Sequence, residues 1–209
     1  DAVIEPVARD LGATVIHRDE TGWRPGEGVL RSPSGRDVRV PFAGRPYPGN
    51  AALAAAAAAH LGVPEAAIVA GIEGATFPGR YQTLASDPWL IVDVAHNPDA
   101  FRVLAQTQRH THPETPFHLV LGLMPDKDAA AIAPSLSALA DSVHVVDGDD
   151  LRAATDLAAL LRTHGVDAHP RGDLSSLPAL VADLRAAGAN LLVTGSHHVV
   201  GALLAAWLR

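Results

Sequence analysis

The stretch Trp89-Leu90-Ile91-Val92-Asp93-Val94-Ala95-His96-Asn97-Pro98 decides how this chain folds. Its first four residues are apolar and include two β-branched side chains, which predicts an interior strand. Asp93 and His96 follow at the C-terminal end of that strand, and Asn97-Pro98 opens a helix as N-cap and first helical residue. In an open α/β sheet, ligands bind outside the carboxyl ends of the strands. We therefore expect these groups and the helix N-terminus to meet a phosphorylated ligand.

From Trp89 onward, short apolar runs typical of strands alternate with longer runs typical of helices. This alternation predicts an α/β, Rossmann-like fold with a mostly parallel sheet and helices on both faces. The expected strands are residues 89–92, 118–121, 143–146, a weaker one near 166–169, and 191–194. The expected helices are residues 98–109, 128–139, 151–163, 176–187 and 199–208.

The first part of the chain follows a different pattern. The expected elements are a helix at 3–10, a strand at 13–18, a hairpin of 28–31 and 38–42 around the turn 32–35, and helices at 50–61 and 64–74. We expect Asn50 to cap the first of these last two helices and Gly62 to close it. Residues 77–84 are expected to be extended and 85–88 to form a linker.

Composition excludes several classes of protein. The formal net charge of −7 and the lack of runs rich in Lys and Arg argue against a nucleic-acid surface. The Ala-rich run 51–59 is too weakly apolar for a membrane span, and it ends at His60. We expect no secretory signal peptide, and the sequence contains no cysteine for disulfides or thiolate chemistry. We therefore expect a cytoplasmic protein that binds neither nucleic acid nor membrane.

Several ligand-binding motifs are missing from the sequence. The single lysine, Lys127, follows Asp126, whereas a Walker A loop needs Gly-Lys followed by Ser or Thr. No Gly-x-Gly-x-x-Gly follows a strand, which argues against an NAD-binding enzyme. The histidine pairs at 110/112 and 197/198 come without cysteine or a His-Glu-x-x-His pattern, so no metal site is predicted. Because an initiator Met before Asp is normally retained, the start at Asp1 predicts a piece of a longer protein.

Four motifs occur in a fixed order: Phe77-Pro78-Gly79-Arg80, Asp93 to Pro98, Asp126-Lys127-Asp128 and Thr194-Gly195-Ser196. Through these four motifs the chain resembles the C-terminal part of the folylpolyglutamate synthase/dihydrofolate synthase family, in the Mur ligase superfamily. The resemblance implies that 1–86 is the tail of a Mur-ligase-type ATPase domain and that 87–209 is the Rossmann-like C-terminal domain. The Walker A loop, the magnesium ligands and most of the pterin pocket would then lie outside this chain.

The resemblance also implies a reaction. An ATP-dependent ligase of this family, using Mg²⁺, activates a carboxylate as an acyl phosphate, and the amino group of L-glutamate attacks it to form an amide. Dihydropteroate or a reduced folate is the acceptor, so the expected role is folate polyglutamylation in one-carbon metabolism. The resemblance implies a monomer, and the chain is expected to be inactive alone.

On the nucleotide side, the resemblance assigns three residues by motif. Asn50 corresponds to a nucleotide contact, Arg80 to the arginine that reaches the ATP phosphates, and Asp93 to the aspartate that binds nucleotide from the second domain. A guanidinium suits phosphate because it stays charged and binds two oxygens at once. The alternatives are a solvated turn arginine for Arg80 and a helix cap for Asp93.

On the substrate side, the resemblance places His96 and Ser196 in the cleft that takes incoming glutamate. His96 can hold a carboxylate there or move a proton from the attacking amine, which makes it a catalytic candidate together with Arg80. The alternatives are a core histidine bonded to backbone and a serine that caps the last helix. Lys127 either grips glutamate or is a solvated loop lysine.

Two other functions stay open on the sequence. The chain can belong to a related Mur ligase that acts on a peptidoglycan precursor or adds another amino acid. It can also be a non-catalytic, stand-alone α/β domain that binds a ligand or regulates a partner. The coding sequence before Asp1 separates these, because a Gly-Lys-Ser/Thr loop there indicates a ligase.

Overall fold

The computed structural model describes residues 3–44 and 46–208, which divide into two compact units. Unit 1 consists of the chain up to Pro41 and of a second segment, which follows residues 42–44 and ends at Thr76. Unit 2 consists of residues 42–44 and of the chain from Phe77 onward. The sequence placed this division at residue 86 instead. Among the described helices, none is long and apolar enough to cross a membrane.

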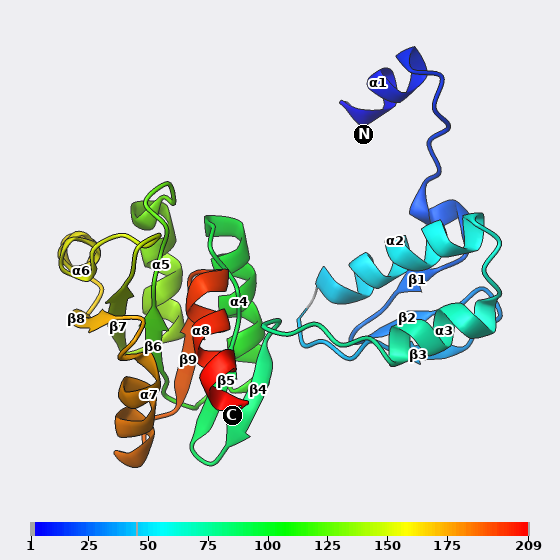
Figure 1. Ribbon diagram of the computed structural model, residues 1–209. Helices are drawn as coiled ribbons and strands as arrows, with labels where there is room; N and C mark the ends of the chain where they lie inside the picture. The colour runs from blue at the N-terminus through cyan, green and yellow to red at the C-terminus, as the bar shows by residue number, and fades with distance from the viewer. Residues whose placement is uncertain (1–2, 45, 209) are drawn as a thin grey trace. The chain divides into compact units, whose positions relative to one another are not determined.

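Unit 1 is a small antiparallel sheet with helices packed against it (Figure 1). Its elements are α1 (Ile4–Asp10), η1 (Arg18–Glu20), β1 (Arg24–Pro25), β2 (Val29–Arg31), β3 (Asp37–Arg39), α2 (Pro46–His60) and α3 (Glu65–Glu73). Helix α2 contacts β1 and β2, and α3 contacts β3. The buried side chains that these contacts cover include Trp23, Leu30, Val38, Ala52 and Ile68.

The structure confirms the first helix, the hairpin and the α3 helix, and it corrects two other predictions in unit 1. Residues 13–17 form no strand and are mostly exposed, because the sheet of β1 to β3 offers them no partner. Asn50 is not an N-cap, because α2 already begins at Pro46. Prolines at 46 and 48 are compatible with the first turn of a helix, where backbone N–H groups have no intrahelical acceptor.

Unit 2 contains a six-stranded sheet in the order β4-β5-β9-β6-β7-β8. The strands are β4 (Gln82–Ser86), β5 (Trp89–Val92), β6 (His118–Leu121), β7 (Ser142–Asp147), β8 (Ala168–Asp173) and β9 (Leu191–Thr194). All pairs are parallel except β4 with β5, which confirms the mostly parallel sheet. The linker predicted at 85–88 is wrong, because Ala85 and Ser86 pair with β5 and close a tight hairpin.

Helices cover both faces of this sheet (Figure 1). One face packs against α4 (Pro98–Thr111), α5 (Ala129–Leu139) and α6 (Ala154–Thr163), and its core includes Phe101, Ile132 and Leu157. The other face packs against α7 (Leu177–Ala186) and α8 (His197–Trp207), and its core includes Val181, Val199 and Leu203. Strand residues alternate between the two cores, as Ile91 and Val92 do.

The order of the strands identifies where a ligand can bind. Strand β9 lies between β5 and β6. The helix after β9 packs on one face of the sheet, whereas the helices after β5 and β6 pack on the other. Such a reversal in the connections is the position at which open α/β sheets bind ligands, outside the carboxyl ends of the strands. Asp93, His96 and Ser196 all follow strands that meet there.

Candidate functional site

Three loops meet at the carboxyl ends of β5, β9 and β6. The N–H of Asp93 donates to the Val193 carbonyl at 3.0 Å, and the Thr194 hydroxyl donates to the Ala95 carbonyl at 3.3 Å. On the other side, the Gly122 N–H donates to the Thr194 carbonyl at 3.3 Å. The ends of these strands are therefore held together by hydrogen bonds between the loops as well as by the sheet.

Two glycines allow the loops after β6 and β9 to touch. Gly195 has φ of +106°, and a Cβ atom there would lie 2.4 Å from the Gly122 carbonyl oxygen. A Cβ atom on Gly122 would in turn lie 2.6 Å from Cγ2 of Val199. Any larger residue would therefore push the two loops apart. This contact explains the glycine in the Thr-Gly-Ser motif, whereas no motif pointed to Gly122.

Asp93 fastens the motif that contains Arg80 to the end of β5. Its side chain is only 7% exposed, yet both carboxylate oxygens have partners. Oδ2 accepts the N–H of Tyr81 at 2.9 Å, and Oδ1 accepts the N–H of Ala95 at 2.8 Å. Burial raises the pKa of Asp93, and these two hydrogen bonds and the charge of Arg80 oppose part of that rise. Asp93 does not cap α4.

Arg80 is half-buried, and its guanidinium carries an unpaired charge. The guanidinium lies over the ring of Phe77, 5.3 Å from the ring centroid. Among the described residues, no carboxylate lies within ion-pair distance of it. Gly79 has φ of +75° and packs so closely that a Cβ atom would lie 2.9 Å from Val94. The turn is therefore fixed while the guanidinium can still bind an anion.

His96 has a defined tautomer. Its Nδ1 lies 3.0 Å from the Val94 carbonyl oxygen, which can only accept. Nδ1 must therefore carry the proton in the neutral ring, which leaves the lone pair on Nε2. The ring is half-buried, and its centroid lies 6.0 Å from that of His197, the first residue of α8. The hydrogen bond from Nδ1 to the backbone, which was the structural alternative for His96, therefore leaves Nε2 able to accept a proton.

Side-chain caps begin three helices at these strand ends. Asn97 accepts the Ala100 N–H at 2.9 Å, which confirms its predicted role in α4. Asp128 accepts the Ala131 N–H at the start of α5 at 3.0 Å, and Ser196 accepts the Val199 N–H at the start of α8 at 3.2 Å. Ser196 is 2% exposed, and its hydroxyl hydrogen is left to donate. Helix N-termini carry partial positive charge, which favours anions.

The remaining predicted residues differ in their surroundings. Lys127 pairs with Asp126 at 2.8 Å, and its side chain is 24% exposed. The hydrogen bond from Lys127 lowers the pKa of the Asp126 carboxyl, and His96 adds a smaller effect in the same direction. Asn50 is exposed on α2 in unit 1, so it is not part of the strand-end group, by which we mean Arg80, Asp93, His96, Lys127 and Ser196.

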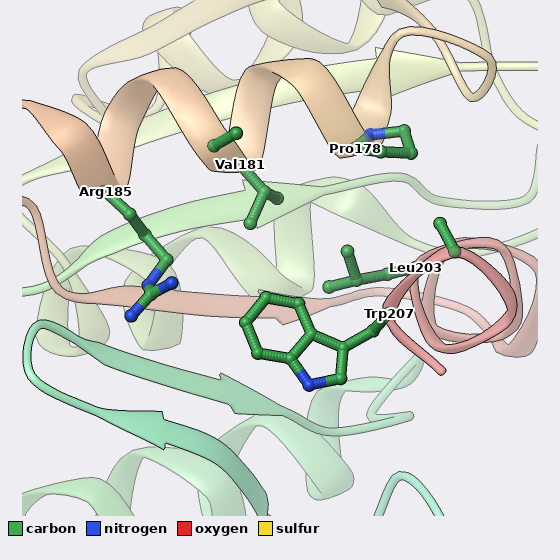
Figure 2. A pocket seen from close by; sticks show the side chains of 7 residues that line it. Pro178, Val181, Arg185, Leu203 and Trp207 are labelled. Atoms are coloured by element: carbon green, nitrogen blue, oxygen red, sulfur yellow. The ribbon is translucent and has the colours of Figure 1, made fainter. Parts of the chain in front are cut away.

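The described residues include no cluster of three or more His, Asp or Glu side chains that could hold a metal ion. An apolar groove lies elsewhere, between α7 and the C-terminal half of α8. Figure 2 shows Pro178, Val181 and Arg185 on one side of this groove and Leu203 and Trp207 on the other.

Sequence reasoning missed Tyr81 as part of this site. Its backbone N–H binds Asp93, and its hydroxyl contacts Gln108 and Thr111 on α4. Its position directly after the Phe-Pro-Gly-Arg motif was a usable signal. No local pattern indicates its partners on α4, because they lie 27 and 30 residues further along the chain.

Comparison with known proteins gives the same family as the motifs. Residues 79–197 match the family described as Mur ligase, glutamate ligase domain. The dihydrofolate synthase/folylpolyglutamate synthase of Escherichia coli K12 is 31% identical over 204 residues, which cover 95% of this chain and 48% of the relative. The UDP-N-acetylmuramoyl-L-alanyl-D-glutamate–2,6-diaminopimelate ligase of Corynebacterium efficiens is 31% identical over 172 residues, or 75% of this chain and 32% of the relative.

Solved structures agree with this assignment. The bifunctional folylpolyglutamate synthase/dihydrofolate synthase of Yersinia pestis, complexed with AMPPNP and Mn ion, superposes with a TM-score of 0.77 at 29% identity. The match covers 99% of this chain and 50% of that one. The chain thus spans about half the length of the relatives it matches. On the family match and these likenesses together, the chain belongs to the Mur ligase family and contains its glutamate ligase domain.

Proposed function

We propose that this chain is the C-terminal part of an ATP-dependent amide ligase that adds L-glutamate to dihydropteroate or a folate. The observation that carries the proposal is the guanidinium of Arg80, which has no carboxylate partner among the described residues and follows a turn whose backbone is bonded to the end of β5. The family description names glutamate, and the Yersinia pestis relative was solved with AMPPNP and Mn ion.

In the first step, a carboxylate oxygen of the acceptor attacks the γ-phosphorus of ATP. An acyl phosphate forms, the bond to the β-phosphate oxygen breaks, and ADP leaves. Arg80 stabilises the negative charge on the transferred phosphoryl group, because its fork of N–H groups stays charged and binds two oxygens. Phe77 supports the guanidinium from one side without neutralising it.

In the second step, the amino group of glutamate attacks the acyl carbon, and phosphate leaves as the amide forms. The amine must lose protons before and during this attack. His96 takes one of them on Nε2, which its bond from Nδ1 to the Val94 carbonyl leaves unprotonated. The Ser196 hydroxyl and the N-terminus of α8 bind a carboxylate of glutamate, and Lys127 adds positive charge to the same side.

The other assignments follow from the same proposal. Asp93 holds the Arg80 turn and takes a hydroxyl of the nucleotide's ribose, and Asn50 contacts the nucleotide from unit 1. Unit 1 is the tail of the ATPase domain, and unit 2 is the C-terminal domain. Mg²⁺ is held outside the described residues. The protein works as a cytoplasmic monomer, and the chain alone is inactive.

The proposal is tested in the longer protein that contains this chain. We expect ADP release that depends on both glutamate and a dihydropteroate or folate acceptor. Arg80→Ala should lower kcat by about 10²–10⁴-fold, in the range found when charge-stabilising groups are removed. The matched control is Arg102→Ala, an exposed arginine on α4 that pairs with Asp99 and should leave kcat unchanged. Equal activity of both variants would refute the role of Arg80.

His96→Ala separates the two steps. It should raise the KM for glutamate more than the KM for ATP. The opposite pattern, a larger change in the KM for ATP, would place this histidine at the nucleotide instead.

A second function is a Mur ligase reaction on another acceptor, which the likeness to the Corynebacterium efficiens ligase favours. ADP release with a muramyl-peptide acceptor, and none with dihydropteroate or folate, would establish it. If no acceptor supports ADP release and a Walker A loop is missing upstream of Asp1, the chain is a non-catalytic binding domain.

A further inference from the structure

Tyr81, the residue after Arg80, has an unusual backbone conformation. Its φ is +46°, the one positive value among the described residues other than glycine. Residues with a Cβ atom adopt this left-handed region at an energetic cost, and such conformations persist only where the surrounding contacts enforce them. The side chain is also buried, with 8% of its surface exposed. Contacts at both ends of this residue must therefore hold it in place.

The backbone end is attached to the end of β5. The Tyr81 N–H donates to Oδ2 of Asp93 at 2.9 Å. On the other side of Arg80, the Gly79 carbonyl accepts the N–H of Val94 at 2.9 Å, and the Gly79 N–H donates to Oε1 of Gln82. Both neighbours of Arg80 are therefore bonded to groups outside the turn.

The side-chain end is attached to α4. The Tyr81 hydroxyl lies 2.7 Å from Oγ1 of Thr111 and within hydrogen-bond distance of the side-chain amide of Gln108. Gln108 is itself buried. Burial raises the pKa of Tyr81 to about 12, so the hydroxyl keeps its proton at neutral pH and can donate. Helix α4 is the same helix whose N-terminus follows His96.

We propose that Tyr81 is the positioning residue of Arg80, bonded to Asp93 through its N–H and to Thr111 and Gln108 through its hydroxyl. The phenol fixes the left-handed turn to α4, and the turn sets where the guanidinium points. Arg80 is thereby held in one position relative to His96 before any ligand arrives. This inference deepens the proposed function, because it rests on the role of Arg80 in phosphoryl transfer.

The first test needs no activity and uses the 209-residue chain. Tyr81→Phe removes the hydroxyl, and Thr111→Val removes its partner on α4. Thr163→Val is the matched control, since the Thr163 hydroxyl donates to a carbonyl of its own helix, α6. Both test variants should speed hydrogen exchange of the amide at position 81 by about tenfold and leave the amides of β6 unchanged. The control should change neither exchange rate. Unchanged exchange at position 81 in both test variants would overturn the proposal that the hydroxyl of Tyr81 fixes the turn.

The second test asks whether the hydrogen bonds of the Tyr81 hydroxyl affect catalysis through Arg80. In the longer protein, Tyr81→Phe should lower kcat by about tenfold and leave the KM for glutamate unchanged. In an Arg80→Ala background, the same substitution should have no further effect on kcat, because it has no guanidinium left to position. A further tenfold loss in that background overturns the proposal in favour of a general structural role.

The two tests also separate this inference from the proposed function. If the longer protein has no ligase activity, the proposed function fails, and the exchange measurement still decides whether the hydroxyl of Tyr81 fixes the turn. If ligase activity is present and Tyr81→Phe leaves both exchange and kcat unchanged, the inference fails alone.

Discussion

Two buried polar groups lie in the same sheet and are stabilised in different ways. Asp93, at the carboxyl end of β5, is held by backbone N–H groups of a turn and of its own loop. His144, inside β7 and 3% exposed, is held by side chains of the neighbouring strands. Backbone donors cannot be moved without refolding the loop, whereas side-chain partners can be replaced or can turn to solvent. The comparison separates a polar group that builds a site from one that the sheet merely accommodates.

The partners of His144 define its protonation. The Arg171 guanidinium on β8 donates to Nδ1 of His144 at 3.0 Å, and a guanidinium can only donate. Nε2 of His144 therefore carries the proton and donates to Nδ1 of His118 on β6, also at 3.0 Å. The rings of His118 and His144 stack with centroids 5.3 Å apart, and His169 on β8 lies 6.3 Å from His144. A second proton on His144 would break the bond from Arg171.

Burial has opposite effects on the pKa values of the two groups. It raises the pKa of Asp93 and, with the charges of Arg171, His118 and His169, lowers the pKa of His144 to about 4. Both shifts favour the neutral form. As the pH rises above the ordinary pKa of a carboxyl, the raised pKa of Asp93 lowers the free energy of unfolding. As the pH rises from 4 to about 6.5, the lowered pKa of His144 raises the free energy of unfolding. The pH dependence therefore distinguishes the two sites.

The largest effect is expected for Asp93→Ala. The variant leaves the N–H groups of Tyr81 and Ala95 buried without an acceptor, which should lower the free energy of unfolding by about 2–5 kcal/mol. Urea denaturation followed by circular dichroism measures this change. Asp99→Ala is the control, an exposed aspartate on α4 whose loss should change stability by less than about 0.5 kcal/mol. Equal stability of the two variants would mean that the backbone N–H groups do not need this carboxylate.

His144→Leu should remove most of the acid sensitivity of unit 2. In the unsubstituted chain, the unfolded state binds a proton at His144 more readily than the folded state, so stability should fall by about 2 kcal/mol from pH 7.5 to pH 5. The leucine variant should lose less over the same range and change little at pH 7.5, because Arg171 is exposed and can bind water. Thermal denaturation at the two pH values tests this. Identical pH dependence with and without His144 would refute the assignment.

The smallest effect is expected at the edge of the histidine group. Asp167 pairs with His169 at 3.1 Å, with 60% and 44% of their side chains exposed. Asp167→Asn should therefore change the free energy of unfolding by less than about 0.5 kcal/mol. The pKa of His144 should also stay low, because burial is the largest cause of its shift. NMR titration of the ring protons measures the pKa values of His144 and His169. A return of the pKa of His144 toward 6.5 would show that charge outweighs burial at this residue.

The strand-end group was largely predictable from the sequence, whereas the histidine group was not. Asn97-Pro98 and Thr194-Gly195-Ser196 are local signals, because a cap and the helix that it begins are adjacent in the chain. His118 and His144 become neighbours only through the pairing of β6 with β7, where Val120 lies opposite His144. Their stacking therefore depends on register, which no local pattern determines.

The errors in the sequence prediction have the same origin. Asp87-Pro88 suggests a break in the chain, and it is a turn within the β4–β5 hairpin. Pro46 and Pro48 suggest an interruption, and they lie in the first turn of α2. In both places the local residues fit two conformations, and packing against distant parts of the same unit selects one of them.

The central position of β9 has a consequence for how the chain folds during synthesis. Leu90 in β5 pairs with Leu191 in β9, and Leu119 in β6 pairs with Leu192 on the other side. The middle of the sheet therefore cannot close until β9 has left the ribosome. Until then, the parallel edges of β5 and β6 stay open to strands of other nascent chains. Truncation before β9 should consequently yield aggregates rather than a smaller folded domain.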